Sequence, residues 1–426
     1  MVIDKDNIKI LLIILVLGLG IGYAYINSDL NINGTAQVNS ANWDVHWANI
    51  QVTSGSVSGT NVVTAPTISN STTVNYSIIL DKPGDYYEFT VDAVNAGTID
   101  AVIDTIDSKL NGATITTLPD YLMYTVTYAD GVALQPNHQL LHNTTEKYKV
   151  RIEYRTDIEL NQIPATNQTL SLQFTVTYRQ ATDDAIAVDH SFNGHSWETI
   201  INNVRSGNTD NYNIGDTKTV DMGSLGTHTL RIANKSTPSE CSTTGFSQTA
   251  CGFVLEFADI ITRHIMNPYE EGVTTSGNGN IGGWPASGMR TYVNSDIYNA
   301  LPSELKNGII NTVVVSGHGT KDSSNFTSTD KLYLLDAKEI YGDSFTNQYN
   351  TAKDSERQLD YYSSQNVTTS NYSGAIKQRN GSNDYWWLRS PYSTGNTIFC
   401  GMSNNGDWRR DRSNITSGVS PAFRIG

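Results

Sequence analysis

The sequence has few cysteines and few charged residues. Only 3 cysteines occur among 426 residues, and charged residues make up 16% of the chain. Neither a Cys-x-x-Cys pair nor the Cys/His spacing of a zinc site is present, so the sequence predicts no metal. Cys241 and Cys251 bracket a short loop that a disulfide can close, but the sequence leaves their Cα separation open. Cys400 is expected to be a buried thiol in a strand.

Positive charge is also scarce. The chain carries 28 Lys and Arg against 42 Asp and Glu, a formal net charge of −14, which argues against a general nucleic-acid-binding protein. Ser, Thr and Asn supply the polarity instead, together with 34 Gly and 23 Tyr, a composition typical of β-rich extracellular proteins. No Lys follows Lys377, whereas five Arg lie at or after Arg389. The C-terminal end is therefore expected to be locally positive.

Motifs of the common enzyme classes are missing. Ser316–Thr320 contains the glycine-flanked His318, but no G-x-S-x-G nucleophile elbow exists to pair with it. The glycine-rich segment Gly277–Gly283 carries no Lys-Ser and opens no clear helix. It is expected to be a flexible loop and not a phosphate-binding loop. The sequence predicts a protein that is not an enzyme and that uses no cofactor.

The length of the chain predicts two or three domains, each able to bury a core. Near the N-terminus, Lys5 and Lys9 precede an uncharged run from Ile10 to Ile26, with Gly22–Ala24 as a candidate cleavage triplet. Residues 1–27 are therefore expected to be an export signal peptide. An uncleaved membrane anchor is the alternative, because the run is at the lower length limit for a membrane span. Membrane contact is expected only through this segment.

Residues 28–180 show the period-two alternation of half-buried strands. The clearest examples are Val74–Leu80, Tyr87–Val91, Tyr124–Tyr128, Tyr148–Tyr154 and Leu170–Tyr178. Turn clusters separate these segments, and about seven to nine strands at this spacing indicate an all-β sandwich. Residues 181–190 lack periodicity and are expected to be a linker.

Residues 191–426 mix short helices and strands, which favours an α+β domain. The expected helices are Trp197–Val204 with Ser196 as N-cap, Val293–Leu301 started by Asn294 or Ser295, and a helical turn at Ala337–Tyr341. The expected strands are Phe253–Phe257, continuing towards Ile265, and Leu332–Leu335. The chain as a whole is therefore predicted to be multidomain, with a β-sandwich followed by this α+β domain.

Two apolar segments bracket a polar one at the end of the chain. They are Trp386–Pro391, which reads WWLRSP, and Gly418–Ile425, which reads GVSPAFRI. The closing segment is apolar enough to be a buried strand, so the terminus is expected to be docked. Rigid elements usually position the irregular segments that contact a ligand. The polar stretch between the two apolar segments is therefore a candidate binding surface.

These C-terminal features resemble the target proteins of diversity-generating retroelements. Such proteins end in a C-type-lectin-like domain, related in fold to formylglycine-generating enzymes. The resemblance rests on WWLRSP, the Phe399–Cys400 step, the Gly406–Trp408 turn and GVSPAFRI, and it extends back to about Ser196. It implies a variable region at residues 393–416 that is rewritten while the brackets stay fixed. Formylglycine-generating enzymes use two cysteines in their C-terminal half, and only Cys400 is present there, so that activity is not supported.

A binding surface needs adaptable hydrogen-bonding groups on a rigid support. The predicted ligand-binding residues are Ser393, Thr394, Asn396, Thr397, Ser403, Asn404, Asn405, Asp407, Arg409, Arg410, Asp411, Arg412, Ser413 and Asn414. The arginines offer planar, fork-shaped donors that match carboxylates or phosphates and stack on rings. The predicted framework residues are Trp386, Trp387, Arg389, Trp408, Phe423 and Arg424, with structural hydrogen bonds assigned to the two arginines. A solvated arginine-rich loop that binds nothing is the alternative.

The stretch Asp29–Ala36, just after the apolar run, resembles the exported camelysin and biofilm-fibre proteins of Gram-positive bacteria. This resemblance implies a surface or fibre-forming sandwich and self-assembly through it, with a generic spacer sandwich as the alternative.

The sequence as a whole predicts an adhesin or receptor on the cell surface of a Gram-positive bacterium. It is expected to recognise a protein or glycan ligand on another cell or phage. The alternative is a structural fibre or pilin-like subunit with a fixed lectin-like domain. No E-P-N triplet is present, so the calcium site of sugar-binding lectins is not predicted.

Overall fold

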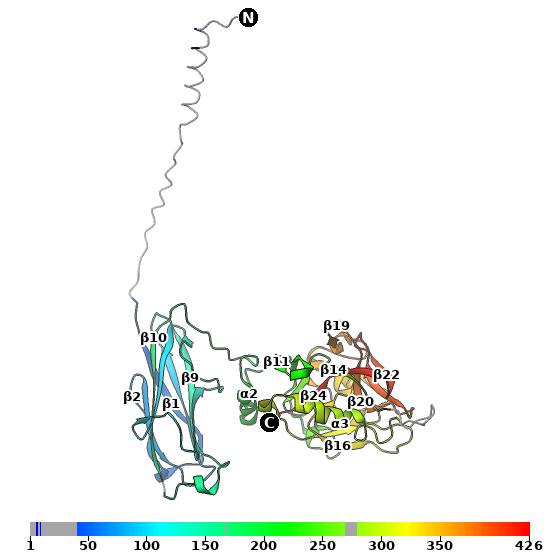
Figure 1. The fold of residues 1–426 in the computed structure, drawn as a ribbon, viewed down its shortest axis with the longest axis horizontal. Helices are drawn as coiled ribbons and strands as arrows, with labels where there is room; N and C mark the ends of the chain where they lie inside the picture. The colour runs from blue at the N-terminus through cyan, green and yellow to red at the C-terminus, as the bar shows by residue number, and fades with distance from the viewer. Residues whose placement is uncertain (1–5, 7–8, 10–40, 167, 269–278) are drawn as a thin grey trace. The chain divides into compact units, whose positions relative to one another are not determined.

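The computed structural model describes residues 6, 9, 41–166, 168–268 and 279–426 (Figure 1). The chain divides into two compact units, Met1–Asn42 and Trp43–Gly426, and the elements given below lie in the second. The predicted signal peptide or anchor falls outside the described residues except for Asp6 and Lys9, and the Asp29–Ala36 stretch falls outside them entirely. Within the described part of the chain, no helix has the length and apolar character needed to cross a membrane.

Residues 45–180, here called the sandwich region, form two antiparallel sheets. The first has the order β1-β4-β9-β7, built from β1 (Val45–Gly55), β4 (Tyr86–Asn95), β9 (Thr144–Tyr154) and β7 (Leu122–Tyr128). The second has the order β2-β3-β10-β5-β6, built from β2 (Val62–Asn70), β3 (Thr73–Ile79), β10 (Thr169–Gln180), β5 (Ala101–Leu110) and β6 (Ala113–Thr114). β8 (Gln139–Leu140) pairs with β5, and the short 3₁₀ helices are η1 (Gly59–Asn61) and η2 (Leu160–Gln162).

The alternation of apolar residues explains how these two sheets share one core. Along β9, Tyr148 and Val150 are buried, whereas Lys149 between them is half-exposed. Trp47 on β1 packs edge-on against Tyr148 of its own sheet, with ring centroids 5.0 Å apart, and against Phe174 of the other sheet at 5.5 Å. This is the layering of a β-sandwich. The five quoted strands are all present, and the described part of the region holds ten strands where seven to nine were predicted.

The segment predicted as a linker, residues 181–190, is hydrogen-bonded over its first half. The amide of Ala181 donates to the carbonyl of Asp100 at 2.8 Å. Further along, Ile186 forms an isolated parallel bridge with His138, and the amide of Ile186 donates to the carbonyl of Asn137 at 2.9 Å. These contacts fix the backbone as far as Ile186. The chain therefore leaves the edge of the sandwich region after position 181, where the predicted linker begins.

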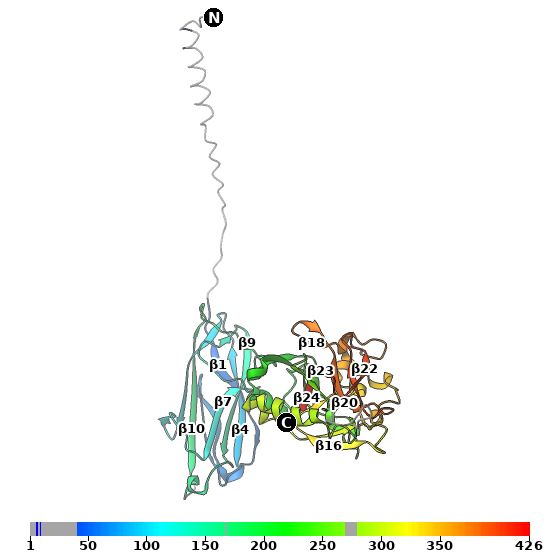
Figure 2. The same ribbon diagram turned by 45° about the vertical axis from the view of Figure 1, so that its right-hand side comes forward.

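The strands of residues 191–426, here called the C-terminal region, fall into two five-stranded sheets and two small ribbons (Figures 1 and 2). The first sheet is β11 (Thr217–Asp221), β12 (Thr227–Asn234), β13 (Val254–Phe257), β24 (Pro421–Arg424) and β17 (Tyr333–Leu334) in that order. The second is β14 (Thr262–Ile265), β23 (Thr416–Val419), β20 (Trp386–Pro391), β21 (Ile398–Met402) and β22 (Trp408–Arg412). The ribbons are β15 (Thr312–Ser316) with β16 (Phe326–Asp330), and β18 (Gln378–Arg379) with β19 (Ser382–Asn383).

The helices of this region are short. They are α2 (Trp197–Ser206), α3 (Gly288–Tyr292), the π-helical η6 (Val293–Ile297), α4 (Tyr298–Ala300), α5 (Ser303–Lys306), α6 (Ala337–Tyr341) and α7 (Asp360–Ser364). The 3₁₀ helices are η3 (Gly223–Leu225), η4 (Ser239–Ser242), η5 (Gln248–Ala250), η7 (Gly342–Ser344), η8 (Lys353–Ser355) and η9 (Ser373–Ala375). The predicted cap of α2 is confirmed, because the Ser196 side chain accepts from the amide of Thr199.

Two sequence predictions in this region are wrong in their boundaries. The helix expected to start at Asn294 or Ser295 begins at Gly288, because the side chain of Ser287 caps it by accepting from the amide of Arg290 at 3.1 Å. The strand expected to run from Phe253 towards Ile265 is two strands. β13 pairs with β24 in the first sheet, whereas β14 pairs with β23 in the second, so the chain changes sheets between them.

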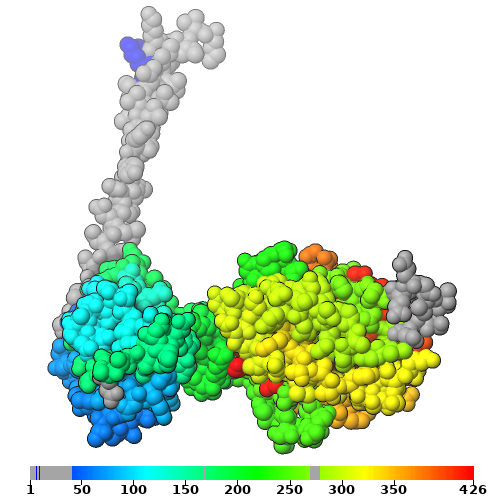
Figure 3. All heavy atoms as spheres, turned by 60° about the horizontal axis from the view of Figure 1, so that its bottom comes forward, coloured from blue at the N-terminus to red at the C-terminus, as the bar shows by residue number. Residues whose placement is uncertain are grey.

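The end of the chain is docked in the core, as predicted. β24 lies between β13 and β17, and Trp386, Trp387 and Phe423 are fully buried. In the face drawn in Figure 3, the red C-terminal residues are visible at only a few points. The structure is thus β-rich with several separate sheets and few helical residues.

Candidate functional site

The predicted framework residue Arg389 is fully buried at the centre of an ion-pair network. Its two terminal nitrogens donate to the two carboxylate oxygens of Glu339, each at 2.7 Å, and one of them also donates to Glu356 at 2.6 Å. Its Nε donates to the carbonyl of Val315 at 2.9 Å. Burial raises the pKa of Glu356 well above its ordinary value, and the neighbouring charge of Asp336 adds to that rise. Arg389 therefore makes the structural hydrogen bonds that the sequence assigned to it.

The other framework residues lie in or against the same core. Trp387 donates from its indole nitrogen to the carbonyl of His264 at 2.9 Å. Trp408 is half-buried and packs edge-on against Phe345, with ring centroids 6.0 Å apart. Arg424 donates to the side-chain oxygen of Gln248 at 3.2 Å. These contacts join both brackets of the polar segment to elements far from it in the sequence.

The predicted ligand-binding residues are arranged along one hairpin. β21 and β22 pair in antiparallel register from Ile398↔Arg412 to Met402↔Trp408, and β22 is the outermost strand of its sheet. The turn that joins them is closed by the amide of Ser403, which donates to the carbonyl of Asp407 at 2.8 Å. Gly406 within this turn has φ +89°, a conformation that side chains disfavour.

The hairpin separates the predicted site into two ends and a connecting edge. Ser403, Asn404, Asn405 and Asp407 lie at the turn. Residues 393–397 lie at the other end, where the amide of Ser413 donates to the carbonyl of Thr397 at 2.8 Å. A five-residue strand spans roughly 14 Å, so a small ligand cannot touch both ends. The structure therefore brings the predicted residues together as a strip along β22 and not as one pocket.

The loop at residues 393–398 is held by an asparagine that sequence reasoning missed. Asn280 is fully buried, and its side-chain amide donates to the carbonyls of Gly395 at 3.1 Å and Ile398 at 2.9 Å. Its own amide donates to the carbonyl of Asn396 at 3.1 Å. Asn280 belongs to the glycine-rich segment that was expected to be a flexible loop, and that prediction is wrong for this residue. No residue pattern distinguishes it, because its partners are 115 and 118 positions away.

The three arginines of β22 have different surroundings. Arg409 is paired with Asp411 at 2.5 Å and its guanidinium lies 4.2 Å from the ring centre of Tyr385. Arg410 is exposed and donates to the hydroxyl of Tyr392 at 2.7 Å. Arg412 is exposed, and its side chain has no hydrogen bond or ion pair within the described residues. Arg410 and Arg412 are thus the more available donors.

The remaining predicted contact residues differ in exposure. Thr394, Asn404 and Asn405 are exposed, and most of the others are half-buried. Ser413 is the exception, because only 5% of its surface is exposed. The carbonyl of Ser413 accepts from the amides of Met266 and Asn267 at 2.8 and 3.0 Å. Ser413 therefore supports the loop by its main chain more than it offers a side chain to a ligand.

The cysteines and the enzyme candidate also have defined positions. Cys241 and Cys251 form a disulfide with Cα atoms 5.8 Å apart, so the pairing that the sequence left open is present. Cys400 is a free, buried thiol whose pKa is raised by burial. The side chain of His318 lies 2.9 Å from the carbonyl of Gly319, and its amide donates to the hydroxyl of Thr351. These contacts are with the main chain of Gly319 and the side chain of Thr351.

Comparison with known proteins finds a match over residues 259–426, which is the larger part of the C-terminal region. No curated protein and no solved structure matches the chain. Residues 259–426, which contain Asn280, the Arg389 network and the β21–β22 hairpin, are similar to a family described as a domain of unknown function (DUF6273).

Proposed function

We propose that the chain is an exported cell-surface binding protein, the variable target of a diversity-generating retroelement. In this proposal residues 191–426 have a C-type-lectin-like fold, and the ligand contacts the strip formed by β22, the 403–407 turn and the 393–397 loop. The single observation that carries the proposal is the way this strip is supported. A buried residue outside it, Asn280, holds the backbone of its 393–398 loop, so exposed side chains on it are free to change.

The chemistry of the strip indicates the class of ligand. Arg410 and Arg412 supply exposed planar donors, and Asn404 and Asn405 supply adaptable amides at the turn. A strip longer than one strand suits a protein or glycan surface on another cell or phage better than a small metabolite. The net charge of −14 argues against nucleic acid as the partner.

The test is deep sequencing of the 3′ end of the coding region across a population of the source organism. Substitutions are expected at codons 393–416, with the codons for Trp386–Pro391 and Gly418–Ile425 unchanged. The codons for the sandwich strand β10 serve as the internal control for background variation. A uniform 3′ end, or variation spread equally over β10 and β22, would remove the diversification claim.

A second function, that of a fibre or pilin-like subunit, is favoured by the edge strand β2. No Asp, Glu, Lys or Arg occurs between Asp44 and Asp81, and β2 exposes Val63 and Ile68 at the edge of its sheet. An uncharged edge is a template for pairing with another chain. Pro66 and three register shifts between β2 and β3 work against such pairing, because they interrupt the ladder.

Sedimentation of the full chain at increasing concentration separates these two functions. If β2 joins subunits, Val63→Lys is expected to abolish concentration-dependent assembly. The matched control is Leu160→Lys, which adds the same charge at an exposed leucine in η2, outside β2. If the wild-type chain stays monomeric at every concentration, the fibre function is excluded and only the binding function remains as a proposal.

A further inference from the structure

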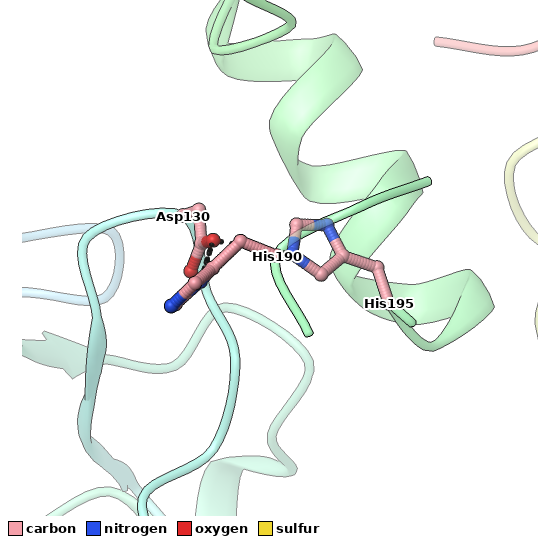
Figure 4. Close-up of side chains that lie close together, drawn as sticks. All are labelled: Asp130, His190 and His195. Atoms are coloured by element: carbon pink, nitrogen blue, oxygen red, sulfur yellow. Dashed lines mark hydrogen bonds and ion pairs between the residues drawn. The ribbon is translucent and has the colours of Figure 1, made fainter. Parts of the chain in front are cut away.

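Two histidines and an aspartate converge at a place that neither the sequence nor the proposed function assigned. Nδ1 of His190 lies 2.5 Å from Oδ2 of Asp130, and Nε2 of His195 lies 3.2 Å from the same oxygen (Figure 4). One ligand atom from each residue lies within 4.8 Å of the others. Among the described residues this is the one such group of three, and His195 is fully buried there.

Two of the three side chains, those of His195 and Asp130, have a second partner that turns them towards the common centre. Nδ1 of His195 lies 2.6 Å from the hydroxyl of Tyr212, which leaves Nε2 facing Asp130. Oδ1 of Asp130 accepts from the amide of Val132 at 3.2 Å, which leaves Oδ2 facing the histidines. On the far side of His190, the buried Nε2 has no hydrogen-bond partner among the described residues, and a carboxylate oxygen of Glu146 lies 3.8 Å away.

This outer arrangement is the one that metal-bound histidines use. A ligating imidazole presents one nitrogen to the ion and donates the other N–H to a carboxylate or another oxygen, which fixes the ring and its tautomer. For His195 that outer oxygen is on Tyr212, which is itself held by the side-chain amide of Asn203 at 2.9 Å. For His190 the nearest carboxylate is that of Glu146, 3.8 Å from Nε2, which is beyond hydrogen-bond distance. The outer hydrogen bond is therefore present for His195 alone.

The local backbone brings the two histidines together over a short stretch of chain. The amide of Gly194 donates to the side chain of Ser191 at 3.2 Å, and the amide of His195 donates to the Ser191 carbonyl at 3.2 Å. A Cβ on Gly194 would lie 2.3 Å from the carboxyl carbon of Asp189, so only glycine permits this close turn. The side-chain amide of Asn203 donates to the carbonyl of Asp130 at 2.5 Å, which ties the Asp130 loop to α2.

We propose that Asp130, His190 and His195 form a binding site for a divalent transition metal, with Zn²⁺ as the probe of choice. Two imidazoles and one carboxylate suit such ions, whereas Ca²⁺ and Mg²⁺ prefer oxygen ligands. The side chains of Asp130 and His190 are 17% and 28% exposed, so a water molecule has access to the fourth position. The bound ion joins the loop after β7 to the start of α2. This site is independent of the β22 strip.

Zn²⁺ titration of the chelator-treated full chain by calorimetry, with metal content measured after dialysis, tests the proposal. One equivalent of Zn²⁺ per chain is expected, with no displacement by excess Ca²⁺ or Mg²⁺. Removing a ligand in His190→Gln is expected to abolish stoichiometric binding. Removing an outer partner in Tyr212→Phe is expected to weaken Zn²⁺ binding about 10- to 100-fold.

The matched control is His142→Gln. His142 pairs with Asp100 at 2.7 Å, as His190 pairs with Asp130, but no second histidine joins it. This variant is expected to bind Zn²⁺ like the wild type. Because His190 is partly exposed, His190→Gln should melt at a temperature close to that of the metal-free wild type, which separates a lost ligand from a lost fold. Substoichiometric Zn²⁺ in the wild type, or unchanged binding in folded His190→Gln, would overturn the site and indicate a metal-free hydrogen-bonded cluster.

Discussion

Arg389 and Glu339 form two parallel hydrogen bonds of 2.7 Å at a point where both side chains are fully buried. The pair joins β20, which precedes the polar segment at residues 393–416, to α6. Such fork-to-fork geometry fixes orientation as well as position. It therefore fixes β20 against α6, although neither residue lies on the proposed binding strip.

Breaking this pair is expected to be strongly destabilising. Glu339→Gln removes the bidentate carboxylate partner of the fully buried Arg389 guanidinium and leaves Glu356 as its remaining partner at 2.6 Å; losing one member of a buried pair costs up to about 3–5 kcal/mol. Urea unfolding of the full chain measures this loss. The control is Asp343→Asn, which breaks the exposed pair with Lys338 and is expected to leave the midpoint unchanged. Equal midpoints for both variants would mean that the buried pair is not structural.

A second carboxylate of this network gives a pH dependence. Burial, followed by the charge of Asp336, holds the pKa of Glu356 well above 4.5, so the folded chain keeps a proton that the unfolded chain has released. The free energy of unfolding therefore falls as pH rises from about 4.5 through the folded pKa. Glu356→Gln is expected to remove this contribution. The free energy of unfolding, measured for both proteins from pH 4 to 8, should fall less steeply with pH in Glu356→Gln than in the wild type. An equal pH dependence in the two proteins would contradict the prediction.

The strands of the sandwich region were predictable because their signal is local. In β9 every second residue from Tyr148 to Tyr154 is apolar, and burial follows that alternation directly. The start of the helix at Ser287 was missed for an equally local reason. Asn294 and Ser295 read as caps, yet their side chains bond back to the carbonyls of Arg290 and Thr291, four residues earlier, inside the helix.

The supports of the two sites were not predictable, because they are long-range. Asn280 contacts Gly395 across 115 residues, and His195 contacts Asp130 across 65. Neither pairing leaves a spacing motif in a single sequence. The polar composition of residues 393–416 pointed to the proposed strip. Only the pairing of β21 with β22 shows that the two ends of the strip lie apart.

The arginines of β22 are expected to differ in their effect on stability. Arg409→Ala removes a partly buried ion pair with Asp411 and a cation–π contact with Tyr385, which together contribute about 1 kcal/mol. Arg412→Ala removes an exposed side chain and is expected to leave the melting temperature unchanged. Thermal unfolding of the two single variants measures this contrast. If Arg412→Ala is the more destabilising change, Arg412 is structural and does not belong to the variable surface.

The buried amide of Asn280 is expected to control the mobility of the 393–398 loop. Asn280→Ala removes the side-chain donor to the carbonyls of Gly395 and Ile398, each of which keeps one backbone donor, and losing a hydrogen bond of this kind costs about 1 kcal/mol. Hydrogen exchange of the loop amides should therefore accelerate, while exchange in the sandwich strand β9 stays the same. Asn404→Ala is the matched control, because Asn404 is exposed at the hairpin turn and its loss should leave loop exchange unaltered. Unchanged exchange in Asn280→Ala would mean that other residues hold the loop. The proposed binding strip would then lose the observation on which it depends.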